Sequence, residues 1–189
     1  MIIFFDTEIM QTVEQAGGWE NVRAGKAGLS AAVTVEDQPP SRVGLYDIHT
    51  VGVLADVLED ADTIVSFYGT GFDIPLISAL IGRHLRPRVH LDLCEEIKAA
   101  VGKPRHGAWG LDAICKRTLG YGKPDGMDGA MAPVMAQNGR MGEVFDYCLK
   151  DVYLLRDLFD HIRLKGWVAG LAGEQILLPK VQEKINALY

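Results

Sequence analysis

The sequence of 189 residues has few cysteines, no long apolar run and no excess of positive charge. Its three cysteines, Cys94, Cys115 and Cys148, are far apart and form no CxxC pair, which argues against a zinc site or a disulfide framework. We therefore expect buried free thiols in a reducing cytoplasm. No apolar stretch reaches the roughly 18–20 residues that span a bilayer, so we expect no membrane partner.

The charge balance restricts the possible functions. With 19 basic and 25 acidic residues the net charge is −6, which excludes a strongly basic protein that coats DNA. An enzyme that acts on nucleic acid remains possible, because it can gather its acids around metal ions. The first ten residues have no basic segment and do not resemble a signal peptide. The length suits one domain over residues 1–189, without repeats or a linker.

Hydrophobic periodicity predicts the secondary structure. Apolar and β-branched runs predict strands at 2–6, 29–36, 42–47, 63–67 and 89–91. Helical spacing of apolar residues predicts helices at 50–60, 74–84, 92–101, 110–119 and 142–162, with a helical tail over 166–189. The glycine-rich segment 10–28 is expected to be a loop or a hairpin, and the segment 120–142 to be mostly loop. Three strands followed by alternating helices and strands predict an α/β fold, a mixed β-sheet flanked by helices.

Several acids lie at the expected ends of core elements. Asp6 and Glu8 are two apart on the first strand and share a face, so they can bind one ion together. Asp73 lies at a strand-to-helix junction, where it is either a metal ligand or a helix N-cap. Tyr147 and Asp151 are four apart and share a helix face. Asp151 is next to apolar positions, which favours a partly buried carboxylate with a positive partner. Taken singly, each motif fits a structural role better: solvated acids for Asp6 and Glu8, a cap for Asp73, and a packed tyrosine with an exposed acid for Tyr147 and Asp151.

Such a set of carboxylates suits phosphodiester hydrolysis. Two divalent ions about 3.5–4 Å apart can hold the attacking and leaving oxygens of this reaction. Mg²⁺ and Mn²⁺ prefer carboxylate oxygens as ligands, and several carboxylates must then converge on one point.

The order of the motifs carries a resemblance. Asp-x-Glu at 6–8, Phe-Asp at 72–73 and Tyr-x-x-x-Asp at 147–151 are accompanied by His90-Leu91-Asp92-Leu93 and Gly110-Leu111-Asp112, and by the segments 119–123 and 128–130. This pattern resembles the Tyr-bearing (DEDDy) branch of the DEDD superfamily of 3′–5′ exonucleases, which has a ribonuclease-H-like fold. It is similar to the proofreading domains of family B DNA polymerases and to stand-alone ribonuclease-H-like domains of bacteria. The resemblance covers about residues 1–165.

The resemblance implies a site and a substrate. Asp6 would bridge two Mg²⁺ or Mn²⁺ ions, Glu8 and Asp151 would complete the site of the first, and Asp73 would hold the second. Tyr147 would orient or deprotonate the attacking water. The implied substrate is the 3′ end of single-stranded DNA or RNA, DNA being favoured, which is released as nucleoside monophosphates. A replication or repair protein is an expected partner.

Further residues are expected to touch the substrate. The resemblance implies Thr7 and Phe72, and it places Tyr68 where the family usually has Asn. We expect the Tyr68 ring to stack on the 3′-terminal base, the alternative being a core tyrosine beneath the sheet. Trp19, flanked by glycines, either stacks on substrate or packs on its own domain.

The segment 98–123 has six basic residues and one acid, a local charge of +5. With Trp109 and Tyr121 it fits a groove for the nucleic-acid backbone, the alternative being a solvated helix face. Lys116, Arg117 and Lys123 are the substrate-binding candidates there.

Two other functions remain open at this point. One is a non-catalytic nucleic-acid-binding or polymerase-accessory module with the same fold. The other is a metal-dependent hydrolase of oligonucleotides or nucleotides.

Overall fold

A computed structural model describes residues 1–102, 107–123 and 129–189. Its main sheet has five strands in the order β3-β2-β1-β4-β5. They are β1 (Ile2–Ile9), β2 (Leu29–Glu36), β3 (Val43–Tyr46), β4 (Thr63–Ser66) and β5 (His90–Asp92). β1 pairs antiparallel with β2 and parallel with β4, which confirms the mixed sheet.

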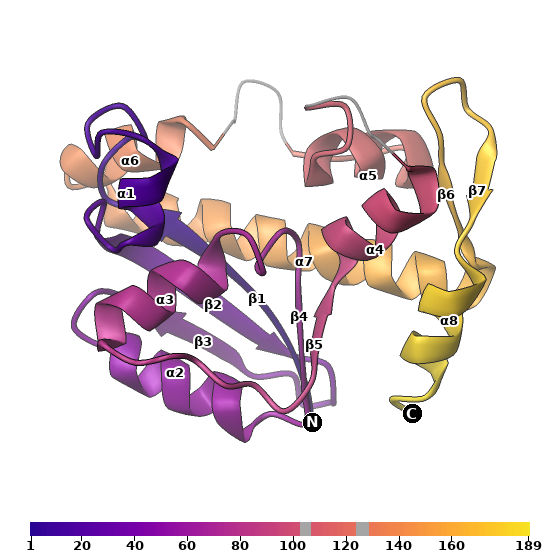
Figure 1. The fold of residues 1–189 in the computed structure, drawn as a ribbon, viewed down its shortest axis with the longest axis horizontal. Helices are drawn as coiled ribbons and strands as arrows, with labels where there is room; N and C mark the ends of the chain where they lie inside the picture. Colours follow the sequence, from indigo (N-terminus) through magenta and orange to yellow (C-terminus); the bar gives the residue numbers. More distant parts are fainter. Residues whose placement is uncertain (103–106, 124–128) are drawn as a thin grey trace.

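Helices cover both faces of this sheet (Figure 1). The long helix α7 (Met141–Lys165) crosses one face, and α2 (Val51–Asp60) and α3 (Asp73–Ile81) lie on the other. The alternation within β1 explains this arrangement, because successive side chains point to opposite faces. Phe4 is buried in the core that contains the residues of α7, and Phe5 in the core that contains those of α2 and α3. The predicted α/β architecture is therefore confirmed.

Two more predicted helices lie beyond the last strand. They are α4 (Leu93–Val101) and α5 (Leu111–Leu119). Asp92 caps α4: its carboxylate accepts the backbone N–H groups of Cys94, at 3.0 Å, and Glu95, at 3.3 Å. The same carboxylate has a second function in the site, described below.

The structure corrects three regions of the sequence prediction. The expected loop 10–28 contains a short helix α1 (Trp19–Arg23), and the expected loop 120–142 contains α6 (Met131–Gln137). The tail is not wholly helical, because β6 (Trp167–Ala169) and β7 (Gln175–Leu177) form a hairpin before α8 (Pro179–Asn186). These elements are too short to give a clear periodicity. Pro179 is at the start of α8, since proline fits the first turn of a helix.

All three cysteines are buried and free, as expected. Within the described ranges, no helix is both long and apolar enough to cross a membrane.

Candidate active site

Three acids converge where β1 meets α7. Asp6 and Glu8 lie on one face of β1, and Asp151 projects from α7, which packs on that face. One carboxylate oxygen from each lies within 4.8 Å of the others. The two-residue spacing on the strand thus brings both β1 acids to the same helix, as the sequence analysis predicts.

Asp73 approaches this triplet from the other face of the sheet. It is the first residue of α3 and is buried. The helix N-cap is Phe72, and no side chain caps it, so the capping alternative for Asp73 is wrong. Its carboxylate instead accepts a hydrogen bond from the Thr7 hydroxyl at 2.5 Å. Thr7 lies between Asp6 and Glu8 on β1, and its side chain points to the opposite face.

Burial and mutual repulsion raise the pKa values of these acids, so their simultaneous ionisation is unfavourable. Burial raises the pKa of Asp6 well above its usual range, and the charges of Asp73, Asp151 and Glu8 raise it further. Burial and the charge of Asp151 likewise raise the pKa of Glu8. Burial raises the pKa of Asp73 to about 7 despite the hydrogen bond from Thr7. All four carboxylates are thus close enough to influence one another, and they need a positive partner.

Lys123 provides one positive charge. Its Nζ lies 2.6 Å from Asp151 Oδ2 and 2.5 Å from the Tyr147 hydroxyl oxygen, so it donates hydrogen bonds to both. Burial alone would lower the pKa of Lys123, but the ion pair with Asp151 and these hydrogen bonds raise it above its usual value. The lysine therefore stays charged. The positive partner expected for Asp151 is confirmed, and it is a residue that the sequence analysis assigned to the substrate backbone.

The loop around Lys123 is fixed by Asp112. The carboxylate of Asp112 accepts the backbone N–H of Lys123 at 2.7 Å. Gly122 permits this approach, because a Cβ at that position would lie 2.4 Å from Asp112 Oδ1. The Gly-Leu-Asp motif at 110–112 therefore positions the lysine that contacts Tyr147.

The carboxylate triplet fits a metal ion. Asp151 Oδ1 is buried without a hydrogen-bond partner, and an orphaned carboxylate oxygen in a polar site is a strong acceptor for a cation. Asp6, Glu8 and Asp151 supply only oxygen ligands, the donor set that Mg²⁺ and Mn²⁺ prefer. The triplet could therefore hold such an ion.

A cavity of about 680 Å³ opens onto the acids and is called here the carboxylate pocket. Its walls include Asp6, Thr7, Glu8, Lys123, Tyr147 and Asp151, with Phe72 and Trp19 at one side. Trp19 lies edge-on to Phe72, with ring centroids 6.0 Å apart, and is 52% exposed. The tryptophan thus packs on its own domain, and about half of its surface remains exposed at the edge of the pocket.

Tyr68 lies outside the walls of the carboxylate pocket. It borders a neighbouring cavity of about 640 Å³, together with Trp19, Arg23, Lys98 and Trp109; we call this cavity the aromatic groove. Tyr68 is 36% exposed, so the alternative of a core tyrosine beneath the sheet is wrong. Its neighbour Asp92 accepts the backbone N–H of Tyr68 at 2.8 Å and so links the end of β5 to this loop.

The other basic candidates lie outside both cavities. Lys116 is exposed and pairs with Asp112. The Arg117 guanidinium carbon is 5.1 Å from the centroid of the Trp109 ring, which is buried. Tyr121 is exposed and donates a hydrogen bond to Asp157. Lys103 and Arg105, which contribute to the +5 charge, lie outside the described residues.

Sequence reasoning missed two residues of this region. Arg23 donates a hydrogen bond from Nε to the Gly71 carbonyl at 2.7 Å, which fastens α1 to the loop before α3. A signal existed, because Arg23 follows Trp19 by four residues and shares its helix face. Cys148 Sγ lies 3.3 Å from the Asp6 carbonyl and donates to it. Nothing in the sequence indicates that contact.

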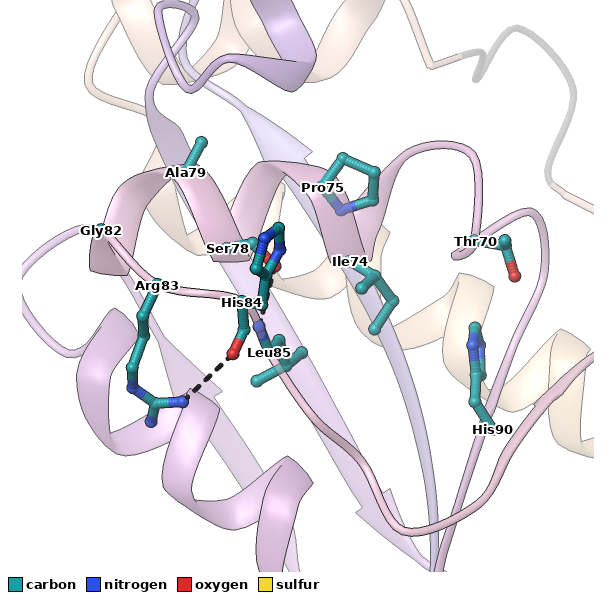
Figure 2. Close-up of a pocket in the computed structure, with 10 residues that line it drawn as sticks. All are labelled: Thr70, Ile74, Pro75, Ser78, Ala79, Gly82, Arg83, His84, Leu85 and His90. Carbon is teal, nitrogen blue, oxygen red and sulfur yellow. Dashed lines mark hydrogen bonds between the residues drawn. The ribbon is translucent and has the colours of Figure 1, made fainter.

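A further cavity of about 670 Å³ lies between α3, the segment after it and β5 (Figure 2). Arg83, His84 and His90 are among its polar walls. The His90 ring is hydrogen-bonded to Ser66 at 2.7 Å. This cavity shares no wall residue with the carboxylate pocket.

Comparison with known proteins identifies the family. Residues 34–163 match the RNase_H superfamily. The chain belongs to this superfamily. The match includes Asp73, Tyr147 and Asp151, whereas Asp6 and Glu8 precede it. No curated protein matches this RNase H superfamily chain.

A solved structure has the same fold. It is the family B DNA polymerase from the hyperthermophilic archaeon Pyrobaculum calidifontis, with a TM-score of 0.64 and 17% sequence identity. The superposition covers 85% of this chain and 24% of the polymerase. This RNase H superfamily chain therefore spans about a quarter of the polymerase, and at this identity the likeness shows the fold alone.

Proposed function

We propose that this protein is a two-metal-ion 3′–5′ exonuclease of the DEDDy type. It hydrolyses the terminal phosphodiester of single-stranded nucleic acid, DNA being favoured, and releases nucleoside monophosphates. The main support is the convergence of carboxylate oxygens of Asp6, Glu8 and Asp151 within 4.8 Å of one another. Asp73 is close enough to raise the pKa of Asp6, and Tyr147 precedes Asp151 by one helical turn. The family membership and the order of the motifs support the same proposal.

The acids would hold two divalent cations, Mg²⁺ or Mn²⁺. Asp6, Glu8 and Asp151 would hold the first, and Asp73, whose charge raises the pKa of Asp6, would hold the second together with Asp6. When bound, these ions neutralise the buried carboxylates and supply an activated water with stabilisation of the leaving oxygen.

Tyr147 acts as a neutral phenol. Burial and the charge of Asp151 raise its pKa above the usual value, although Lys123 opposes this. Its hydroxyl oxygen accepts a hydrogen bond from Lys123 at 2.5 Å, which leaves its own hydrogen free to donate. We therefore assign Tyr147 to orienting the water rather than to removing its proton. Lys123 is a positioning residue, because it holds both this hydroxyl and Asp151.

The reaction breaks one bond and forms one. The water oxygen bonds to the phosphorus of the last phosphodiester, and the bond from that phosphorus to the O3′ of the preceding nucleotide breaks. The water proton passes to solvent, and the departing O3′ takes up a proton to become the new terminal hydroxyl. Thr7 and Phe72, which line the pocket, face the terminal nucleotide.

The similarity to a polymerase agrees with a replication or repair partner. We assign exposed Lys116 to the backbone of the strand outside the pocket, and Arg117, whose guanidinium lies 5.1 Å from the centroid of the Trp109 ring, to supporting that wall of the aromatic groove. Both assignments follow from charge and position.

The decisive experiment follows degradation of single-stranded DNA and RNA labelled at either end. With Mg²⁺ or Mn²⁺, a 5′-labelled strand should shorten by single nucleotides, whereas a 3′-labelled strand should release labelled monophosphate at once. EDTA should stop both reactions. Binding without hydrolysis would support the accessory-module alternative, and hydrolysis of free nucleotides alone would support the small-substrate alternative.

A further inference from the structure

The aromatic groove and the carboxylate pocket have opposite character. The carboxylate pocket contains Asp6, Glu8, Glu14 and Asp151. Among the described residues, the walls of the aromatic groove include no acid but two bases, Arg23 and Lys98. Its volume of about 640 Å³ lies within the usual range for ligand pockets, about 300–1,000 Å³.

Trp19 joins the two cavities, because it lines both. Its ring packs edge-on against Phe72 of the carboxylate pocket, with centroids 6.0 Å apart. Arg23, on the same short helix, is hydrogen-bonded to the Gly71 carbonyl. The tryptophan therefore stands at a fixed boundary between the acids and the aromatic groove.

The backbone at Tyr68 is held in a strained conformation. Its φ of 70° lies in the left-handed region, and Tyr68 is the one non-glycine residue with positive φ in the described ranges. The Asp92 carboxylate maintains it by accepting the N–H groups of Tyr68, at 2.8 Å, and Thr70, at 2.9 Å. Residues kept in such conformations cluster at functional sites. Here the strain presents a tyrosine ring to the groove.

The groove pairs flat rings with positive charge. Lys98 Nζ lies 4.3 Å from the centroid of the Tyr68 ring. Trp109 lines the groove and is 8% exposed, and the Arg117 guanidinium carbon lies 5.1 Å from the centroid of its ring. Exposed rings beside cations match a nucleotide, whose base stacks on an aromatic face while its phosphate meets a cation.

We propose that the aromatic groove binds the unpaired nucleotide immediately upstream of the 3′-terminal one. Its base stacks against the rings of Tyr68 and Trp19, and its phosphate meets Lys98 and Arg23. The inference rests on the proposed exonuclease function and deepens it, because it divides the substrate between two cavities. Tyr68 then contacts the upstream base and not the terminal base. Bases in an intact duplex offer no free face, so the groove selects single strands.

The test measures binding separately from hydrolysis. In EDTA, a 5′-labelled hexathymidylate is competed with unlabelled thymidine monophosphate, dithymidylate and tetrathymidylate, and with a blunt duplex. The parent protein should bind dithymidylate and tetrathymidylate more tightly than the monophosphate, and the duplex weakly. Base–aromatic stacking is worth roughly 5- to 140-fold per base. In Y68A and in W19A, the gain with length, which is the increase in affinity from the monophosphate to the longer strands, should shrink by a factor of that order. Y68F should retain the full gain.

Tyr153 supplies a matched control. It is 38% exposed and has the Arg156 guanidinium carbon 5.3 Å from its ring centroid, but it lines neither cavity. Y153A should therefore leave the gain with length unchanged. The melting temperature of each variant shows that it is folded, and W19A tests the same groove from an exposed residue on another element.

The outcomes separate the two proposals. If strands bind with a gain that depends on Tyr68 and Trp19 but are never hydrolysed in Mg²⁺ or Mn²⁺, the exonuclease assignment fails and the groove assignment stands. If the parent protein hydrolyses strands while Y68A and W19A keep the full gain with length, the groove assignment is overturned. Equal binding of duplex and single strand also overturns it.

Discussion

The Lys123 ammonium lies 2.6 Å from a carboxylate oxygen of Asp151, within an otherwise acidic pocket. The lysine comes from the segment after α5 and the acid from α7, and the ammonium also contacts the Tyr147 hydroxyl. A single side chain thus links a metal-ligand candidate to the residue proposed to orient water.

Replacing Lys123 by methionine should separate metal binding from turnover. The variant adds one net negative charge to the pocket, so Mg²⁺ or Mn²⁺ should bind at least as tightly. Turnover should fall by about 10²-fold or more, because the Tyr147 hydroxyl loses its anchor. Calorimetric metal titration and single-turnover kinetics test this. Lys150 pairs with Asp146 at 2.6 Å on the exposed side of α7, so Lys150→Met is the control. Weaker metal binding in Lys123→Met would contradict the assignment.

Tyr147→Phe removes only the hydroxyl. We expect turnover to decrease by about 10²-fold or more, because the attacking water loses the hydroxyl that orients it, with metal affinity retained. Tyr153→Phe on the same helix should have no effect. Turnover equal to that of the parent protein would show that Tyr147 serves only for packing.

The metal-free protein should lose stability as the pH rises. The pKa of Asp73 is about 7 in the folded protein, and those of Asp6 and Glu8 are raised well above their usual range. Since carboxylates in the unfolded chain titrate near 4, the folded state binds protons more tightly. The contribution of these groups is fully present below about pH 4 and is lost as the pH rises through 7 and beyond.

Divalent metal should reverse this loss. Mg²⁺ or Mn²⁺ binds the ionised acids of the folded state, so it should raise the melting temperature more at pH 8 than at pH 5. Asp6→Ala should abolish both the shift and the activity. Thermal unfolding with and without EDTA measures this, and a metal shift independent of pH would argue against a carboxylate site.

Substrate affinity should fall with salt. On a single strand the slope of log K against log salt is about −0.7 per neutralised phosphate. Lys116→Glu should make the slope less negative by the contribution of about one phosphate. We choose Lys116 because charge reversal of Arg117, packed on Trp109, would disturb the fold. Lys180→Glu on α8 is the control for general charge effects. A slope unchanged in Lys116→Glu would place the strand elsewhere.

The sequence by itself determined the elements with strong periodicity and the identity of the acids. The apolar residues that begin at Ile2 in β1 and those that recur at helical spacing in α7 each form one buried face. Strand, helix and sheet class therefore followed from residue spacing. The two-residue interval of Asp6 and Glu8 likewise placed both on one face. The short elements α1, α6 and the β6–β7 hairpin carry too few residues for a periodic signal, and tertiary packing decided them.

Tertiary structure alone decided the partners. Lys123 is 28 residues from Asp151 along the chain, and only the packing of α5 against α7 brings them together. Asp92 has the local signature of a helix cap, yet its carboxylate also binds the loop at Tyr68, 24 residues away. Spacing along a chain reports which face a side chain occupies. What that face meets depends on contacts between distant segments, which bring Lys123 to the acids and Tyr68 to the adjoining groove.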